Sequence, residues 1–255
     1  MPADSVDCCI TSPPYWGLRD YGHGDQLGLE PTPEAYVQNM VEVFREVHRV
    51  LKPTGTLWLN LGDSYAGKKQ LQGIPWRVAF ALQADGWYLR QDIIWHKPNP
   101  MPESVTDRCT KAHEYLFLLS KSERYFYDHE AVKEPVLNPG KPRKFRDAKD
   151  NSSSTMRNDN GRLYIPKADR NKRDVWTIPT KPFKGAHFAV MPEALVEPCI
   201  LAGCPSGGLV LDPFTGSGTV GAVAVRHGRN FMGTELNPEY INIATGRIQS
   251  EVMPL

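Results

Sequence analysis

The sequence predicts an α/β fold in which a mostly parallel sheet carries helices on both of its faces. Short apolar runs typical of buried strands alternate with longer stretches that have helical spacing. A glycine-rich turn, residues 212–218, joins one such run to a segment of small residues. Strand, glycine turn and helix in this order place a nucleotide-like cofactor at the carboxyl end of a strand. The chain of 255 residues has room for one large domain with an inserted segment.

The first predicted strand, residues 6–10, leads directly into the sequence TSPPYW at residues 11–16. The two prolines restrict the backbone, so we expect a rigid turn with a hydroxyl group on one side and two aromatic rings on the other. One interpretation is a structural turn that merely ends a strand. The other is a functional turn, because the carboxyl ends of parallel strands face one crevice.

The middle of the chain continues the alternation of strands and helices. Apolar spacing predicts a helix over 33–51 that ends before Pro53, and a second helix over 73–85. Strands are predicted at 56–61, 87–97 and 114–120, with a proline-rich loop over 98–108. Asp63 follows the strand 56–61, where a solvated turn residue is one interpretation.

A basic segment follows, poor in large apolar residues. Residues 133–184 contain eight Lys and six Arg against one Glu and five Asp, a local balance of +8 in a chain of net charge +1. Such a segment is often flexible until a polyanion orders it. A plain surface insertion is the alternative interpretation.

The last third holds the predicted cofactor site. A helix beginning near Pro192 leads to the strand 209–211, the glycine turn and a helix over 219–225. The strand 230–235 ends in Glu235, about twenty residues after the turn, where an acidic side chain can accept hydrogen bonds from ribose hydroxyls. Asn237 is a suitable cap for the final helix.

The motif Ser12-Pro13-Pro14-Tyr15, followed much later by the sequence DPFTGSG at residues 212–218, resembles the amino-methyltransferases of DNA. The order of the two motifs is similar to that of the beta group of this family. The resemblance implies a Rossmann-like, S-adenosylmethionine-dependent methyltransferase fold with a mixed, mostly parallel sheet and an inserted basic recognition segment. It also implies methyl transfer to the exocyclic amine of a base flipped out of double-stranded DNA.

The resemblance implies three groups of site residues. The predicted catalytic residues are Ser12, Pro13, Pro14 and Tyr15. The predicted cofactor-binding residues are Thr11, His187, Phe188, Ala189, Asp212, Phe214, Gly216, Ser217, Gly218, Thr219, Glu235, Leu236 and Asn237. The predicted DNA-binding residues are Arg108 and, from the local excess of positive charge, Lys141, Arg143, Lys144 and Arg146. For Asp63 the resemblance offers a DNA contact as the alternative to a solvated turn residue.

The serine at the first motif position resembles the N4-cytosine enzymes more than the N6-adenine enzymes. Adenine N6 is the alternative target, and a catalytically impaired, truncated DNA-binding homologue is the alternative outside enzymes. A cognate restriction endonuclease is a further partner that the family suggests. The chemistry requires no metal and no covalent nucleophile. Five cysteines without framework spacing, no signal peptide and no membrane-spanning run predict a cytoplasmic protein. The resemblance implies that it is prokaryotic or phage-encoded.

We expect residues 1–128 to form the catalytic half of the methyltransferase domain, 129–184 the target-recognition segment and 185–255 the cofactor half. In the family a strand, a helix and an acidic residue precede the Ser-Pro-Pro-Tyr strand, whereas only about five residues precede it here. This departure predicts a sheet that lacks one edge strand and some cofactor contacts. Either Met1 is not the natural start, or the enzyme is minimal or decayed.

Overall fold

The computed structural model describes residues 1–20, 22, 24–67, 69–136, 139–140, 143–144, 163–164, 167–180 and 190–252. The chain forms two compact units, one made of residues 1–128 and 173–255 and the other of residues 129–172. The predicted insertion, 129–184, therefore extends past the boundary of the second unit. Its role in target recognition stays a prediction.

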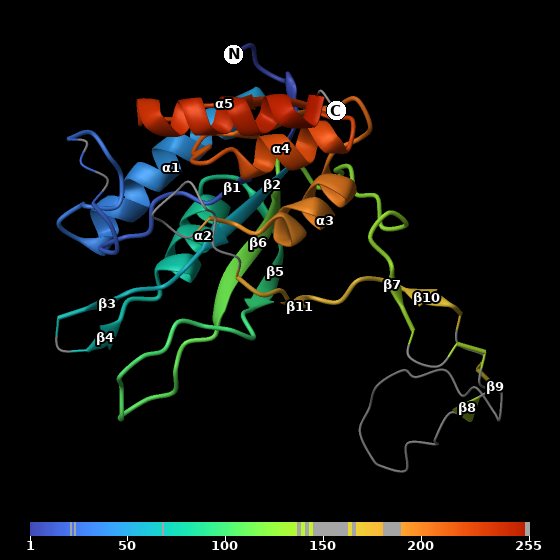
Figure 1. Cartoon of the computed structure of the whole chain (residues 1–255), viewed down its shortest axis with the longest axis horizontal. Helices are drawn as coiled ribbons and strands as arrows, with labels where there is room; N and C mark the ends of the chain where they lie inside the picture. Colours follow the sequence, from blue (N-terminus) through green and yellow to red (C-terminus); the bar gives the residue numbers. More distant parts are fainter. Residues whose placement is uncertain are drawn as a thin grey trace. The chain divides into compact units, whose positions relative to one another are not determined.

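The larger unit is built on a seven-stranded sheet in the order β11-β5-β6-β2-β1-β12-β13 (Figure 1). Six of these strands run parallel to one another, and β6 runs antiparallel to both of its neighbours. The sheet strands are β1 (Val6–Thr11), β2 (Leu51–Leu61), β5 (Tyr88–His96), β6 (His113–Ser120), β11 (Val175–Thr177), β12 (Leu209–Asp212) and β13 (Asn230–Gly233). The predicted mixed, mostly parallel sheet is thus confirmed.

The edges of the sheet differ from the prediction. We expected one edge strand to be missing, and in the described part of the chain no strand pairs with the outer side of β13. The sheet nevertheless has seven strands, because β11 pairs in parallel with β5 at the opposite edge. Sequence analysis assigned these three residues to the basic insertion. Their place in the sheet depends on Trp176, which is buried.

Helices cover both faces of the sheet (Figure 1). They are α1 (Pro33–Val50), α2 (Ile74–Ala84), α3 (Glu193–Gly203), α4 (Thr219–Arg226) and α5 (Pro238–Val252). The apolar residues of α1 and α2 form one core with alternate residues of β2, such as Leu57 and Leu59. Trp58 points to the other face, where Gly203 of α3 packs so tightly that a Cβ atom there would overlap the indole.

Three short two-stranded sheets complete the described structure. In the larger unit β3 (Tyr65–Ala66) pairs with β4 (Gln70–Leu71), and in the smaller unit β7 (Glu134–Pro135) pairs with β10 (Asp169–Arg170). The smaller unit also contains β8 (Arg143–Lys144) paired with β9 (Leu163–Tyr164). Within the described residues, no helix is both long and apolar enough to cross a membrane.

Candidate active site at the carboxyl edge of the sheet

The two sequence motifs meet where β1 and β12 end side by side. These strands pair in parallel, with Cys9 opposite Leu211, so Thr11 and Asp212 both emerge at the same edge. The Thr11 hydroxyl donates a hydrogen bond to Asp212 Oδ1 at 2.6 Å, and the Phe214 N–H donates to the same oxygen at 3.0 Å. This contact joins positions 201 residues apart in the sequence.

The surroundings of Asp212 change the pKa of its carboxyl group. Its side chain is buried, and burial raises the pKa of its carboxyl group from 3.8 to about 7, against the opposing hydrogen bonds from Thr11 and Phe214. The nearby Glu235 carboxylate raises it further. The protonation state of this buried acid between the two turns therefore changes near neutral pH.

The glycine turn is tied to the end of β13 by one carboxylate. Glu235 accepts a hydrogen bond from the Gly216 N–H at 2.7 Å on one oxygen and from the Asn237 N–H at 2.9 Å on the other. Each carboxylate oxygen has a second lone pair for a ligand hydroxyl. Gly216 has a φ of +51°, and a Cβ atom there would have no neighbour closer than 4.0 Å. Open space beside a carboxylate suits a ribose-containing cofactor.

Gly218 packs closely against the last helix. Its φ is +78°, and an added Cβ would lie 2.8 Å from the Ala244 Cα of α5. Helix packing therefore already requires the absence of a side chain here. Its cofactor contact through the backbone stays a prediction.

The remaining predicted cofactor residues have varied surroundings. Ser217 and Thr219 are buried, whereas Leu236 is exposed. Asn237 Oδ1 accepts from the Glu239 N–H at 2.9 Å, as expected of the residue that caps α5. The predicted segment His187, Phe188 and Ala189 lies outside the described residues.

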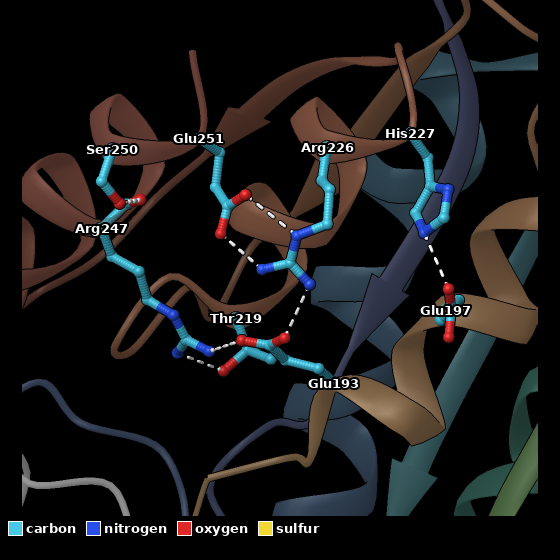
Figure 2. Close-up of polar contacts among 8 residues, drawn as sticks. All are labelled: Glu193, Glu197, Thr219, Arg226, His227, Arg247, Ser250 and Glu251. Atoms are coloured by element: carbon cyan, nitrogen blue, oxygen red, sulfur yellow. Dashed lines mark hydrogen bonds and ion pairs between the residues drawn. The ribbon is translucent and has the colours of Figure 1, made fainter. Parts of the chain in front are cut away.

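Ion pairs brace the helix that follows the glycine turn, as Figure 2 shows. Glu193 of α3 accepts from Arg226 of α4 at 2.7 Å and from Arg247 of α5 at 2.6 Å. Arg247 also donates to the Thr219 hydroxyl at 2.9 Å. Three helices are thus joined, with Arg247 bonded at the start of α4 and Arg226 lying at its end.

The Ser-Pro-Pro-Tyr turn is held by side chains from other elements. The Tyr36 hydroxyl of α1 donates to the Pro14 carbonyl at 2.8 Å. The Tyr15 ring lies against the backbone of Gly62, where a Cβ atom would come within 2.6 Å of Tyr15 Cε2. The turn is therefore clamped between α1 and the end of β2.

A polar cluster surrounds the Tyr15 hydroxyl. That hydroxyl donates to Glu114 Oε2 of β6 at 2.7 Å and accepts from Asn60 Nδ2 of β2 at 2.6 Å. Ser12 Oγ donates to the Tyr15 oxygen at 3.3 Å, and Lys97 forms an ion pair with Glu114. Burial and the Glu114 charge raise the pKa of Tyr15 well above its usual value.

Sequence analysis missed Asn60 and Glu114 as parts of this cluster. One signal was present for Asn60, because it is the only polar residue in the apolar run 57–61. Glu114 gave no such signal, since an acid at the start of a strand usually faces solvent. Asn60 reaches Tyr15 because β2 pairs in parallel with β1, so both strands end at the same edge. Glu114 reaches it because β6 runs antiparallel and begins at that edge.

The structure assigns Asp63 a third role that we did not consider. Its carboxylate accepts from the N–H groups of Ser64, Gly73 and Ile74 at 2.9–3.1 Å. It therefore caps the start of α2 and is neither a free DNA contact nor a solvated turn residue.

The predicted DNA contacts are described only in part. Arg108 Nη1 donates to Glu103 Oε2 at 2.6 Å, and the guanidinium lies over the Tyr65 ring, 4.4 Å from its centroid. Its contact with DNA stays a prediction. Arg143 and Lys144 form the backbone of β8, and nothing of their side chains is described. Lys141 and Arg146 lie outside the described residues.

Comparisons with known proteins agree with this arrangement. A family model described as DNA methylase, of the N6/N4 type, matches residues 6–246. Type II methyltransferase M.Cfr9I of Citrobacter freundii is 47% identical over 98% of this chain and 84% of its own. Type II methyltransferase M.SmaI of Serratia marcescens is 45% identical over 97% of this chain and 86% of its own.

Solved structures show the same fold. The PvuII DNA methyltransferase, described as cytosine-N4-specific, has a TM-score of 0.72 at 24% identity and covers 96% of this chain and 80% of its own. A putative DNA modification methylase of Thermus thermophilus, TTHA0409, was solved complexed with S-adenosyl-L-methionine. It has a TM-score of 0.65 at 25% identity and covers 100% of this chain and 90% of its own.

Proposed function

The chain belongs to the N6/N4 DNA methylase family, and we propose that it transfers a methyl group from S-adenosylmethionine to N4 of cytosine in double-stranded DNA. The observation that carries this proposal is the contact of the two motifs through Thr11 and Asp212 at 2.6 Å. It brings the predicted cofactor turn and the predicted catalytic turn to one edge of the sheet. Curated relatives named type II methyltransferases support a role in restriction and modification. A cognate endonuclease stays a prediction.

The chain's own residues would bind and orient the two reactants. Glu235 would accept hydrogen bonds from the ribose hydroxyls, and Gly216 would leave room for the ribose beside it. When bound, the cofactor supplies an electrophilic methyl group on a sulfonium. An exocyclic amine is a weak nucleophile, because its lone pair is delocalised into the ring. Ser12 Oγ and the Pro13 carbonyl are the predicted acceptors for its N–H groups, held by a rigid turn.

The base is the less constrained part of the proposal. The choice of cytosine N4 is inferred from Ser12 at the first motif position, and adenine N6 is the alternative target. The decisive experiment is to methylate unmodified DNA with the protein, digest it and identify the product nucleoside by mass spectrometry. N4-methylcytosine is expected, whereas N6-methyladenine would keep the chemistry and change the base. Cofactor binding without any product would indicate a protein that has lost catalysis.

We also propose that the basic segment contacts the DNA backbone. Replacing Lys141, Arg143, Lys144 and Arg146 by Ala should weaken DNA binding and flatten its dependence on salt, since fewer counterions are released. The slope of log affinity against log salt measures this directly. An unchanged slope would show that the segment does not touch DNA. Equal losses on all sequences would indicate phosphate contacts without base recognition.

A further inference from the structure

Ser12 stands at one end of a continuous hydrogen-bonded chain whose other end is an ion pair. Ser12 Oγ donates to Tyr15 Oη at 3.3 Å, Tyr15 Oη donates to Glu114 Oε2 at 2.7 Å, and Glu114 Oε1 pairs with Lys97. We propose that Glu114 is a positioning residue that makes Ser12 a hydrogen-bond acceptor for the target amine. This inference rests on the proposed function.

The direction of the chain follows from the number of hydrogens available. An ionised carboxylate can only accept hydrogen bonds, so the single Tyr15 hydrogen must point to Glu114. The Tyr15 oxygen then accepts, both from Asn60 at 2.6 Å and from Ser12. The single Ser12 hydrogen is used, and the remaining Ser12 lone pairs are left for another donor.

Two neighbouring side chains hold the Glu114 carboxylate in place. Lys97 and Glu114 are exposed by only 18% and 16%, so their pairing is shielded from solvent. Asn60 Nδ2 donates a further hydrogen bond to Glu114 Oε2 at 2.8 Å. Lys97 also lies over the Trp95 ring, 4.3 Å from its centroid, which limits where its ammonium can move.

An acceptor at Ser12 matters for the proposed reaction. If Ser12 donated its hydrogen to the amine, it would bind the lone pair that must form the new N–C bond. As an acceptor it instead binds an amine hydrogen and leaves the lone pair free. With the cofactor bound, this lone pair would form the N–C bond as the S–C bond breaks, and the amine proton that Ser12 Oγ holds would be released to water.

A merely structural role for Glu114 predicts different results. Glu114→Gln introduces an amide that can donate to Tyr15, which frees the Tyr15 hydrogen to turn toward Ser12. We expect its single-turnover rate to fall by about 10- to 100-fold, as for other positioned groups. Affinities for S-adenosylmethionine and DNA should stay within about twofold. A structural defect would instead lower the thermal midpoint and both affinities together.

The double variant gives the sharper test. Tyr15→Phe removes the middle of the chain and should cost about tenfold in rate by itself. Adding Glu114→Gln to it should cost nothing more, because the link is already broken. Glu251→Gln, which removes a carboxylate that pairs with Arg226 in the helical layer, is the matched control and should keep the wild-type rate.

Several outcomes would overturn the inference. One is a wild-type rate in Glu114→Gln, and another is losses in the double variant that simply multiply. Should Glu114→Gln fail to fold, Tyr15→Phe still decides, since a wild-type rate would show that the link to Ser12 is unimportant. A wild-type protein that yields no methylated nucleoside would overturn the proposed function itself, whereas an active wild type with unaffected variants would overturn only this inference.

Discussion

The glycine part of the turn at residues 212–218 is held by a carboxylate close to it in the sequence, whereas the Tyr15 hydroxyl in the turn at residues 11–16 is held by side chains from distant strands. Glu235, which bonds to Gly216, lies 19 residues away. Tyr15 is bound by Asn60 and Glu114, which lie 45 and 99 residues away. The 212–218 turn uses glycines and backbone N–H groups, and the 11–16 turn uses prolines and buried side chains. A cofactor site can thus be built locally, but the setting of the catalytic turn requires the whole sheet.

The largest expected effect comes from Tyr15→Ala, which removes the centre of the catalytic turn. We expect methyl transfer to fall by about 1000-fold, since both base stacking, at about 1–3 kcal/mol, and the placement of Ser12 are lost. Cofactor affinity should change little, because the 212–218 turn does not use Tyr15. Single-turnover methylation beside calorimetric titration of the cofactor measures both. Equal losses in rate and cofactor affinity would break the separation of the two turns.

A second prediction concerns Asp212, whose hydrogen bond with Thr11 joins the two turns. Its folded pKa of about 7 lies above the ordinary value of 3.8, so the folded protein keeps a proton that the unfolded chain loses as pH rises from about 4 to 7. Asp212 therefore favours folding below pH 4 and loses up to about 4 kcal/mol of that contribution by pH 7.

Asp212→Asn should remove this dependence and keep both hydrogen bonds to Oδ1. Relative to the variant, the wild type should lose unfolding free energy between pH 4 and 7 and change no further above pH 7. Urea unfolding of the cofactor-free protein at pH 4.5, 6 and 8 measures the difference. A constant difference across these values would show that Asp212 is ionised throughout.

Substitutions at the two glycines of the cofactor turn distinguish a glycine required by helix packing from one that leaves space for a ligand. Gly218→Val places a branched side chain at positive φ against Ala244 and should cost about 3 kcal/mol of unfolding free energy. Gly216→Ala meets only open space and should cost about 1 kcal/mol from its φ. Cofactor affinity, measured on the folded fraction, should fall more for Gly216→Ala than its small loss of stability suggests. Equal stability losses would contradict the assigned difference.

What the sequence predicted follows the same division. The α/β fold, the order of its strands and helices, and the two motifs could be identified because hydrophobic spacing and short motifs are local signals. Glu114 could not be placed, since its contact depends on the antiparallel insertion of β6 between β2 and β5. Asn60 could not be placed, since its contact depends on the pairing of β2 with β1. Strand β11 was missed because three residues within a basic segment carry too little pattern. Asp63 was misassigned, because its capping partners start ten residues later.

The smallest expected effect concerns Glu235. Glu235→Ala removes a predicted ribose acceptor and frees the N–H groups of Gly216 and Asn237, which water can then reach. We expect cofactor affinity to fall about tenfold, in line with one charge-assisted hydrogen bond, and the rate at saturating cofactor to stay within about threefold. Glu235→Gln keeps one acceptor oxygen, so its cofactor affinity should lie between those of the wild type and Glu235→Ala. Calorimetric titration with S-adenosylmethionine decides. Unchanged affinity in Glu235→Ala would show that the carboxylate only shapes the turn, and a comparable loss of saturated rate would show that the local turn also controls the distant one.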